Sequence, residues 1–324
     1  MTLVDEILEE AGFSKIAIEA VKSGKLHYGG SLDAASDKEL SVKLAFHLKA
    51  ELDGAKEIFL ASPKKKEYDP TVESLGMIAE DGGDGTLDDF SGIILTNEKV
   101  MEKLYRSASS HAGSDLNLAK DEIAMFKKCT THEEVEHCLR QILLDRFRAY
   151  RAHGLAGIKP YVRGSKEFST AEELKKQIQA GGKPPTRSAV FNKYVVEYPN
   201  NPPAGVEESF FWVNSIIDSK PTIALVHRVG MPHDGGYVYM ERHFYLSRSH
   251  NCLQGFGAAL PVEDGAVVLY LTRTSTDQVG GLGSTAKRAI GNKLMGSRMA
   301  DNFERARAVL AAAVAEKEMD KLKL

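Results

Sequence analysis

In the stretch GGYVYMERHFYLSRS, residues 235–249, aromatic or polar side chains alternate with mostly aliphatic ones. This alternation determines the architecture expected for the last third of the chain. Successive side chains of a β-strand point to opposite faces of a sheet, so the alternation divides this segment into two faces. The aliphatic face predicts packing in a core, where Arg242 would need an internal partner. The aromatic face, with its polar tips, either covers the surface or lines a cavity. The aromatic face would carry Tyr237, Tyr239, Glu241, His243, Tyr245 and Ser247, and the aliphatic face Val238, Met240, Arg242, Phe244 and Leu246.

Segments on both sides of this stretch also have the composition of strands. The connections between them are short, and short connections join antiparallel neighbours. At residues 249–251 (SHN) we expect a turn or bulge whose polar side chains bond the freed backbone. The sequence therefore predicts a meander of five or six antiparallel strands. The further strands are expected at SAVFNKYVVEYP (188–199), ESFFWVNSII (208–217), PTIALVHRVG (221–230), near 252–260 and at GAVVLYLTRT (265–274).

A long amphipathic helix is expected to follow the meander, broken or bent around Gly291 and Gly296. The glycine-rich segment before it, GGLGSTAKRAIG (280–291), is interpreted as a flexible corner. Residues 97–180 predict a layer of helices, because capping residues precede apolar positions that recur every three or four residues. The remaining elements are expected as one or two helices over 2–23, a strand over 40–49, a short helix over 52–61 and an extended segment over 73–80.

The composition is that of a globular protein, with 43% hydrophobic and 27% charged residues. The formal net charge is -3, so no overall field favours nucleic acid or an anionic membrane, and we expect no nucleic-acid partner. The basic run PKKKEYDP (63–70) is interpreted as a solvated loop. No stretch approaches the ~20 apolar residues that span a bilayer, and the acidic N-terminus does not resemble a signal peptide. We expect a cytoplasmic protein, or a periplasmic one if a targeting segment has been removed.

Residues that bind metals or carry out common catalytic chemistry form no recognised pattern in the sequence. Three cysteines without a C-x-x-C pair argue against a zinc site or a disulfide scaffold. A bridge between Cys129 and Cys138 would require the segment before the helix to fold back. His132 and His137 are five apart and diverge around a helix, so they cannot share a metal ion. The motifs of serine hydrolases, phosphate loops and zinc peptidases are missing, so we predict no metal and no cofactor and assign no catalytic residue.

The order of these elements, with a strand near 40, a later meander and a long terminal helix, resembles the START-like helix-grip superfamily. In that superfamily a curved sheet wraps around the terminal helix and encloses a cavity for lipids, sterols, polyketides or other apolar ligands. The resemblance implies an α+β fold in which a curved antiparallel sheet grips the C-terminal helix. It also implies a single domain over 1–324 with 97–180 as a helical insertion. Two segments, RAHGLAGIKPYVRGSKEF (151–168) and RTSTDQVGGLGSTAKRAIG (273–291), are also similar to uncharacterised bacterial proteins.

Seven residues of the expected strands are candidates for ligand contacts. His243 and Tyr245 are the most attractive, because polar tips on an aromatic face can position a ligand's polar group. Glu241 and His243 are two apart, about 7 Å along a strand, which we expect to be too far for a direct contact. Arg273 ends an apolar face and either pairs with a carboxylate or holds an anionic head group. The seven candidates are Phe211, Trp212, Tyr239, Glu241, His243, Tyr245 and Arg273.

The leading functional hypothesis is binding or transport of an apolar small molecule in an internal cavity. The alternative is a cofactor-independent enzyme on the same scaffold, such as a cyclase, hydrolase or lyase that uses His243 or Glu241. A third hypothesis is an interaction protein in which the helices of 97–180 dock a partner. Fold resemblance alone does not choose among these hypotheses, because one fold hosts many functions.

Overall fold

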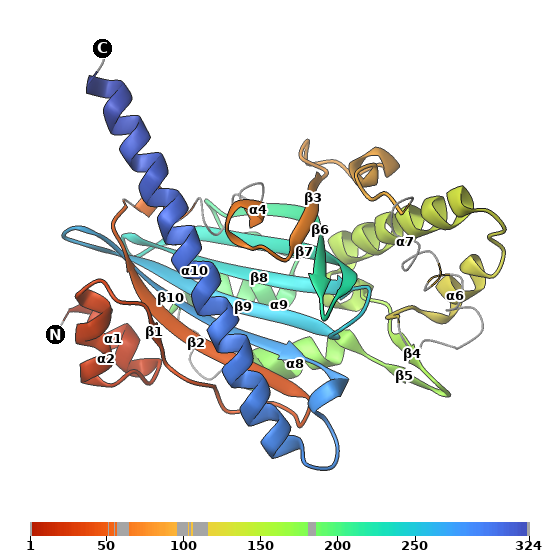
Figure 1. The fold of residues 1–324 in the computed structure, drawn as a ribbon, viewed down its shortest axis with the longest axis horizontal. Helices are drawn as coiled ribbons and strands as arrows, with labels where there is room; N and C mark the ends of the chain where they lie inside the picture. Colours follow the sequence, from red (N-terminus) through yellow and green to blue (C-terminus); the bar gives the residue numbers. More distant parts are fainter. Residues whose placement is uncertain are drawn as a thin grey trace.

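A computed structural model describes residues 2–50, 52–54, 56, 65–95, 103, 105, 116–180 and 186–322 of the chain. Its centre is one antiparallel sheet of eight strands in the order β1-β2-β10-β9-β8-β7-β6-β3 (Figure 1). The sheet is not closed, since β1 and β3 form its two edges. The strands are β1 His27–Tyr28, β2 Glu39–Leu48, β3 Val72–Ile78, β6 Glu207–Ile217, β7 Lys220–His233, β8 Gly236–Leu246, β9 Cys252–Val262 and β10 Gly265–Ser275.

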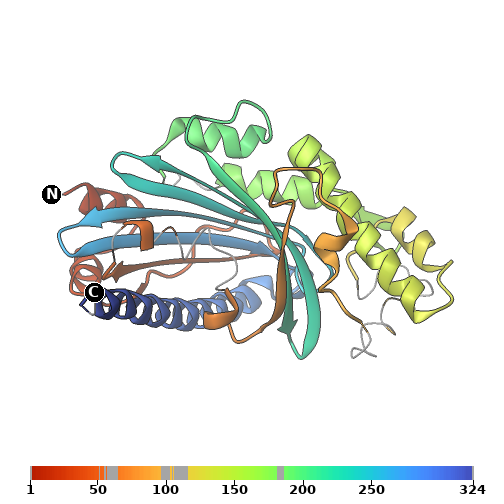
Figure 2. The ribbon, with the colours of Figure 1, turned by 90° about the horizontal axis from the view of Figure 1, so that it is seen from above.

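The C-terminal helix α10, Ser284–Leu322, crosses one face of this sheet, which we call the inner face (Figures 1 and 2). Its apolar side packs on β2 and β10, where Phe303 lies 5.1 Å from the ring of Phe46 and 5.3 Å from that of Tyr270. The short helix α4, Lys65–Tyr68, contacts both α10 and β3. The inner face is therefore covered by two helices that lie far apart in the chain.

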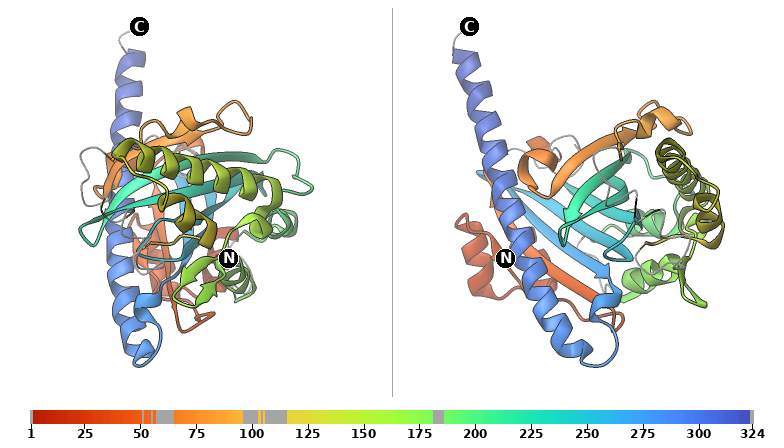
Figure 3. Two further views of the ribbon diagram at one scale, coloured as in Figure 1. Left: turned by 90° about the vertical axis from the view of Figure 1, so that its right-hand side faces the viewer. Right: turned by 45° about the vertical axis from the view of Figure 1, so that its right-hand side comes forward.

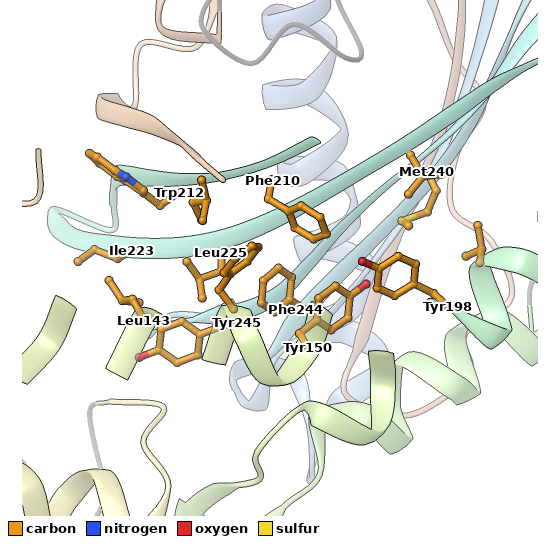
Figure 4. Packing of buried hydrophobic residues seen from close by; sticks show 14 of the residues in the cluster. Leu143, Tyr150, Tyr198, Phe210, Trp212, Ile223, Leu225, Met240, Phe244 and Tyr245 are labelled. Atoms are coloured by element: carbon orange, nitrogen blue, oxygen red, sulfur yellow. The ribbon is translucent and has the colours of Figure 1, made fainter. Parts of the chain in front are cut away.

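The opposite, outer face is covered by the helices of the N-terminus and of the segment between β3 and β6 (Figures 2 and 3). A large apolar core fills the space between these helices and the sheet (Figure 4). At its centre the ring of Tyr150 stacks on Phe244 at 4.0 Å and on Tyr198 at 5.4 Å. The helices are α1 Leu3–Glu10, α2 Lys15–Lys22, α6 Lys120–Phe126, α7 His132–His153, α8 Thr170–Ala180 and α9 Ala189–Glu197, with a hairpin of β4 Tyr161–Arg163 and β5 Lys166–Phe168 before α8.

The predicted α+β class is confirmed, as are the antiparallel meander, the strand near 40 and the terminal helix. The predicted strand over 188–199 is wrong, because residues 189–197 form α9. Ser188 caps this helix by accepting a hydrogen bond from the Phe191 amide at 3.3 Å. Phe191, Tyr194, Val195 and Tyr198 are buried at helical spacing, so aromatic and β-branched side chains here serve a helix face.

Of the break or bend predicted in the terminal helix, the break is wrong, because α10 runs continuously from Ser284 to Leu322. Its glycines have another purpose. A Cβ atom at Gly291 would lie 2.7 Å from Leu40, and one at Gly296 would lie 2.5 Å from the Tyr28 ring. The two glycines therefore let α10 approach the edge of the sheet closely. The predicted helix over 52–61 and the first of the helices expected over 97–180 fall largely outside the described residues.

Candidate functional site

Charged and polar side chains converge on Glu241 at the middle of the inner face. Arg228 lies directly across from Glu241 in the β7–β8 pairing, and its Nε donates to Glu241 Oε2 at 2.6 Å. His243, two residues along β8, has its Nε2 at 2.9 Å from Glu241 Oε1. Lys65 reaches the same oxygen from α4, with its Nζ at 3.7 Å. The hairpin of β7 and β8 and the distant helix α4 thus surround one carboxylate.

This cluster is largely removed from water. The exposed fraction of the side chain is 5% for Arg228, 12% for His243 and 14% for both Glu241 and Lys65. Burying a charge is costly unless it is paired and hydrogen-bonded. Two cations face the single carboxylate, so with neutral histidines the cluster carries a net positive charge. This buried cluster of charged and titratable groups is therefore the candidate functional site.

The surroundings determine the protonation of both titratable groups. Burial by itself would raise the pKa of Glu241, but Lys65, Arg228 and the bond from His243 hold that pKa well below its usual value. Burial lowers the pKa of His243, and the bond to Glu241 offsets this only in part. At neutral pH Glu241 is therefore ionised and His243 is neutral. A neutral imidazole beside an ionised carboxylate donates its Nε2–H to it, which leaves Nδ1 as an acceptor.

The cluster also contains buried polar atoms that have no hydrogen-bond partner within the described part of the chain. They are Nδ1 of His243, Nη1 of Arg228 and Nε2 of His250, which lies in the β8–β9 loop. Burial, followed by the proximity of His243, lowers the pKa of His250 to about 3, so this imidazole is also neutral at pH 7. The site therefore offers both a buried acceptor and a buried donor. A ligand group that donates would satisfy the His243 nitrogen, and one that accepts would satisfy the Arg228 nitrogen.

Apolar side chains flank the cluster on both sides of the inner face. One group lies toward β3 and β6, where the Arg228 guanidinium stands 4.8 Å above the Phe211 ring. The other lies beneath α10 and includes Tyr239, whose hydroxyl donates to the Leu269 carbonyl at 3.3 Å. The first group is Val72, Phe211, Val213, Ala224, Val226 and Leu246. The second is Val42, Leu44, Phe46, Leu48, Tyr237, Tyr239, Ala259, Ala266, Val268, Tyr270, Ala306 and Leu310.

Four of the seven candidate residues lie on the inner face, namely Phe211, Tyr239, Glu241 and His243. The other three lie on the outer face. Trp212 packs in the large core and its indole donates to the Asp89 carbonyl at 2.7 Å. Tyr245 lies 4.3 Å beneath the guanidinium of Arg146 in the same core. Arg273 pairs with the buried carboxylate of Glu39 and donates to the Asp33 carbonyl at 2.7 Å.

Two expectations about β8 are wrong. A β-bulge sets Leu225 opposite Tyr245 and Val226 opposite His243, so Phe244 is an extra residue and the alternation shifts by one. Tyr245 therefore faces the outer core with Phe244, and Leu246 faces inward. The expected gap between Glu241 and His243 is also bridged, because both side chains are long enough to bend toward each other.

Sequence reasoning missed Arg228, Lys65 and His250 as members of the site. Lys65 belongs to the basic run at 63–70, which was interpreted as a solvated loop, although its side chain is only 14% exposed. His250 was assigned to a turn, and the chain does turn there, since β8 ends at Leu246 and β9 begins at Cys252. The cross-strand register of β7 and β8 was the signal that would have placed Arg228 opposite Glu241.

Other classes of site receive little support within the described residues. No group of three or more metal-binding side chains is found there. Cys129 and Cys138 are both free thiols, and burial followed by the neighbouring Cys129 raises the pKa of Cys138 to about 12. Among the helices described, none combines the length and apolar character needed to cross a membrane.

Comparisons with known proteins assign no family to this chain. No protein-family model matches the chain, and no curated protein sequence matches it. A similar solved structure is described as the crystal structure of Ara h 8.0201, with 12% sequence identity and a TM-score of 0.20. The similar region covers 33% of this chain and 73% of that chain.

Proposed function

We propose that the protein binds or carries a small, largely apolar molecule at the inner face of its sheet. In this proposal His243 receives the one polar group of the ligand. The apolar body of the ligand lies along the side chains that flank the cluster, between α10, α4 and the strands β7 and β8. Ligand sites in proteins commonly combine an apolar lining with a few convergent polar groups.

The observation that carries the proposal is the state of the two nitrogens of His243. Its Nε2 is held by Glu241 at 2.9 Å, whereas its Nδ1 is buried and has no partner in the described chain. A buried polar atom left without a hydrogen bond costs about 1–3 kcal/mol. A ligand hydroxyl that donates to Nδ1 removes this cost. Glu241 and Arg228 then act as positioning residues that fix the imidazole.

The polar contact can be tested with two probes that differ by one hydroxyl group, 2-naphthol and naphthalene. Isothermal titration calorimetry should show that the wild-type protein binds 2-naphthol about tenfold more tightly, which corresponds to one hydrogen bond. His243→Leu should remove this difference while naphthalene still binds. His233→Leu is the matched control, because His233 lies at the end of β7 outside the cluster. Equal affinities for the two probes in the wild-type protein would argue against the polar contact.

The presence of any ligand can be tested independently. Native mass spectrometry of the purified protein should reveal a co-purifying molecule that denaturation releases. If the protein is consistently empty and no probe binds saturably, the binding proposal is wrong.

An enzyme is the second candidate, and the contact between Glu241 and His243 favours it. A neutral imidazole that is oriented by a carboxylate and has a free nitrogen can act as a general base. Incubating the released ligand with the protein separates the two candidates. A carrier returns the ligand with its mass unchanged, whereas an enzyme converts it, and the conversion should be lost in His243→Gln. Unchanged turnover in that variant would remove His243 as the base.

A further inference from the structure

Apolar and basic side chains form a strip along the exposed side of the first half of α10 and of the loop before it. Its helical members lie on the side of α10 that faces away from the sheet, and Leu282 lies in the loop before the helix. Ile290 and Leu294 are four residues apart and share this side, whereas Met295, Met299 and Phe303 pack toward the sheet. We call the following residues the α10 strip: Leu282, Lys287, Ile290, Lys293, Leu294 and Arg298.

The apolar members of the strip are among the most exposed large hydrophobic residues described. Leu282 is 99% exposed, Ile290 64% and Leu294 58%. Leu282 stands between Gly281 and Gly283, which both have a positive φ of 74° and have nothing within 4 Å of where a side chain would begin. The loop that carries Leu282 projects at the lower end of the molecule (Figure 1). Neighbouring exposed apolar side chains of this kind mark an interaction site.

The charge of the strip differs from that of the chain as a whole. Residues 278–300 contain four basic residues and no Asp or Glu, although the chain carries a net charge of -3. Lys287, Lys293 and Arg298 of this segment are exposed, while Arg288 is half-buried and donates to the Ser36 carbonyl at 3.2 Å. Asp277, just before the segment, is paired with Lys38 and Arg163. Two exposed carboxylates border the strip, Asp37, which accepts from the Gly281 amide at 3.2 Å, and Asp301, three residues after Arg298, but the three basic side chains of the strip outnumber them.

We propose that the α10 strip docks onto the surface of an anionic lipid bilayer. Basic residues are attracted to anionic headgroups, and apolar side chains between them enter the boundary between headgroups and acyl chains. A nucleic acid would satisfy the charges but would leave Leu282, Ile290 and Leu294 in water. The side of α10 opposite the strip covers the inner face, so docking brings the proposed ligand site to a bilayer. The docking rests on the strip alone and holds whether or not that site binds a ligand.

Vesicle sedimentation tests the proposal with the full chain. Vesicles of phosphatidylcholine with about 30% phosphatidylserine should bind the protein, and pure phosphatidylcholine vesicles should bind it far less. The charge variant Lys287→Ser, Lys293→Ser, Arg298→Ser should lower the partition coefficient on the order of 100-fold, about fivefold for each residue. A matched control, Lys120→Ser, Lys127→Ser, Lys128→Ser, removes the same charge from exposed positions of α6 and its end. This control should bind nearly as well as the wild-type protein.

The apolar part of the strip has its own variant and control. Leu282→Ser, Ile290→Ser, Leu294→Ser should weaken binding at least tenfold, since each buried methylene contributes to the affinity. Ile16→Ser, Val190→Ser, Val196→Ser changes exposed apolar residues elsewhere and should have little effect. Failure of the wild-type protein to bind the anionic vesicles overturns the proposal. The proposal is also overturned if the strip variants and their controls weaken vesicle binding equally. Binding of RNA through the same lysines, without binding of vesicles, would overturn it too. Both strip variants should keep their affinity for 2-naphthol, which separates this test from that of the ligand site.

Discussion

Glycines opposite tyrosines set the packing of the inner face at the scale of single residues. Tyr239 is paired with Gly257 across the β8–β9 ladder, and its ring lies over the glycine where a side chain would otherwise be. The Tyr270 ring reaches diagonally from β10 and covers Gly255, two residues before Gly257 on β9. The rings thus lie flat against the sheet beneath α10. This close approach requires glycine at both positions.

Gly257→Ala should therefore destabilise the protein by about 1–3 kcal/mol, the usual cost of overpacking a core. The reason is that the added methyl group would overlap the Tyr239 ring. Urea unfolding measures the change in free energy. The same substitution in a Tyr239→Leu background should cost clearly less, because the shorter side chain leaves room. Equal costs in both backgrounds would contradict the proposed overlap.

His227 on the outer face gives the stability of the protein a dependence on pH. Burial lowers its pKa to about 4, although Glu208 on one side opposes this shift, and its Nδ1 contacts the Tyr150 hydroxyl at 2.9 Å. Because the folded pKa lies below the unfolded value, the unfolded chain takes up a proton first as the pH falls. The contribution of His227 is complete above about pH 6.5 and should decline by about 3 kcal/mol toward pH 4.

His227→Gln isolates this contribution from those of the other buried histidines. The stability difference between the wild-type protein and the variant should shrink as the pH falls from 7 to 4. Equilibrium unfolding at several pH values measures it. A difference that stays constant across this range would show that His227 is not held neutral in the fold.

The alternation of side chains predicted the residues near the site but not their contacts. It correctly put Tyr239, Glu241 and His243 on one face, because period two holds as far as His243. It failed at Tyr245, since nothing in the local sequence marks Phe244 as the extra residue of a bulge. Arg228 and Lys65 could not be predicted as neighbours of Glu241 without the strand register and the position of α4.

At the scale of elements, Arg242 joins the helices of the outer face to the sheet. The prediction that it needs an internal partner is confirmed, because its guanidinium donates to Gln254 Oε1 at 3.0 Å, the Tyr150 hydroxyl at 3.0 Å and the Val195 carbonyl at 3.1 Å. These bonds connect β8 with β9, α7 and α9. Elements that are separated by long stretches of sequence are thereby held by one side chain.

Arg242→Met should cost roughly 3 kcal/mol, because three buried partners lose bonds to a charged donor. Urea unfolding measures the loss, and hydrogen exchange should show faster opening of α9 than of the central strands. Arg305→Met, on the exposed side of α10, is the control and should change stability by less than about 0.5 kcal/mol. A loss no larger than that of the control would mean that Arg242 does not hold the helices.

Helix and strand identities were predictable where period and composition agreed, as in α7, α8 and β10. They were not predictable in α9, where residues that favour strands form a helix because they fill the core around Tyr150 and Phe210. The sequence also predicts a break or bend at the glycines of α10, because their packing role is not visible locally. Their purpose depends on Leu40 and Tyr28, which are more than 200 residues away in sequence.

At the scale of the whole molecule, the two faces of the sheet differ in how their polar residues are used. On the outer face Arg242, Arg273 and His227 are bonded to the helices and strands around them. On the inner face Arg228 and His243 keep buried atoms without a partner in the described chain. These polar residues of the outer face thus stabilise the fold. Oε1 of Glu122 and the Tyr245 hydroxyl on the outer face also lack a partner in the described chain, so the inner face is distinguished by having such atoms on two residues, Arg228 and His243, that both bond the Glu241 carboxylate.

Ligand binding at the inner face should stabilise the whole fold. At a free concentration of 100 times its Kd, 2-naphthol should raise the free energy of unfolding by about 2.7 kcal/mol, because it binds the folded chain and not the unfolded one. Thermal or urea unfolding with and without the probe measures this effect. In His243→Leu the same concentration should give a smaller increase. An increase that is equal in both proteins would place the probe elsewhere.

A crystal structure of the protein saturated with 2-naphthol tests the central claim most directly. We predict electron density for the probe between α10 and strands β7 and β8, with its hydroxyl oxygen within hydrogen-bonding distance of His243 Nδ1. Density only on the outer face or at the surface, with His243 Nδ1 contacted by water alone, would contradict the claim.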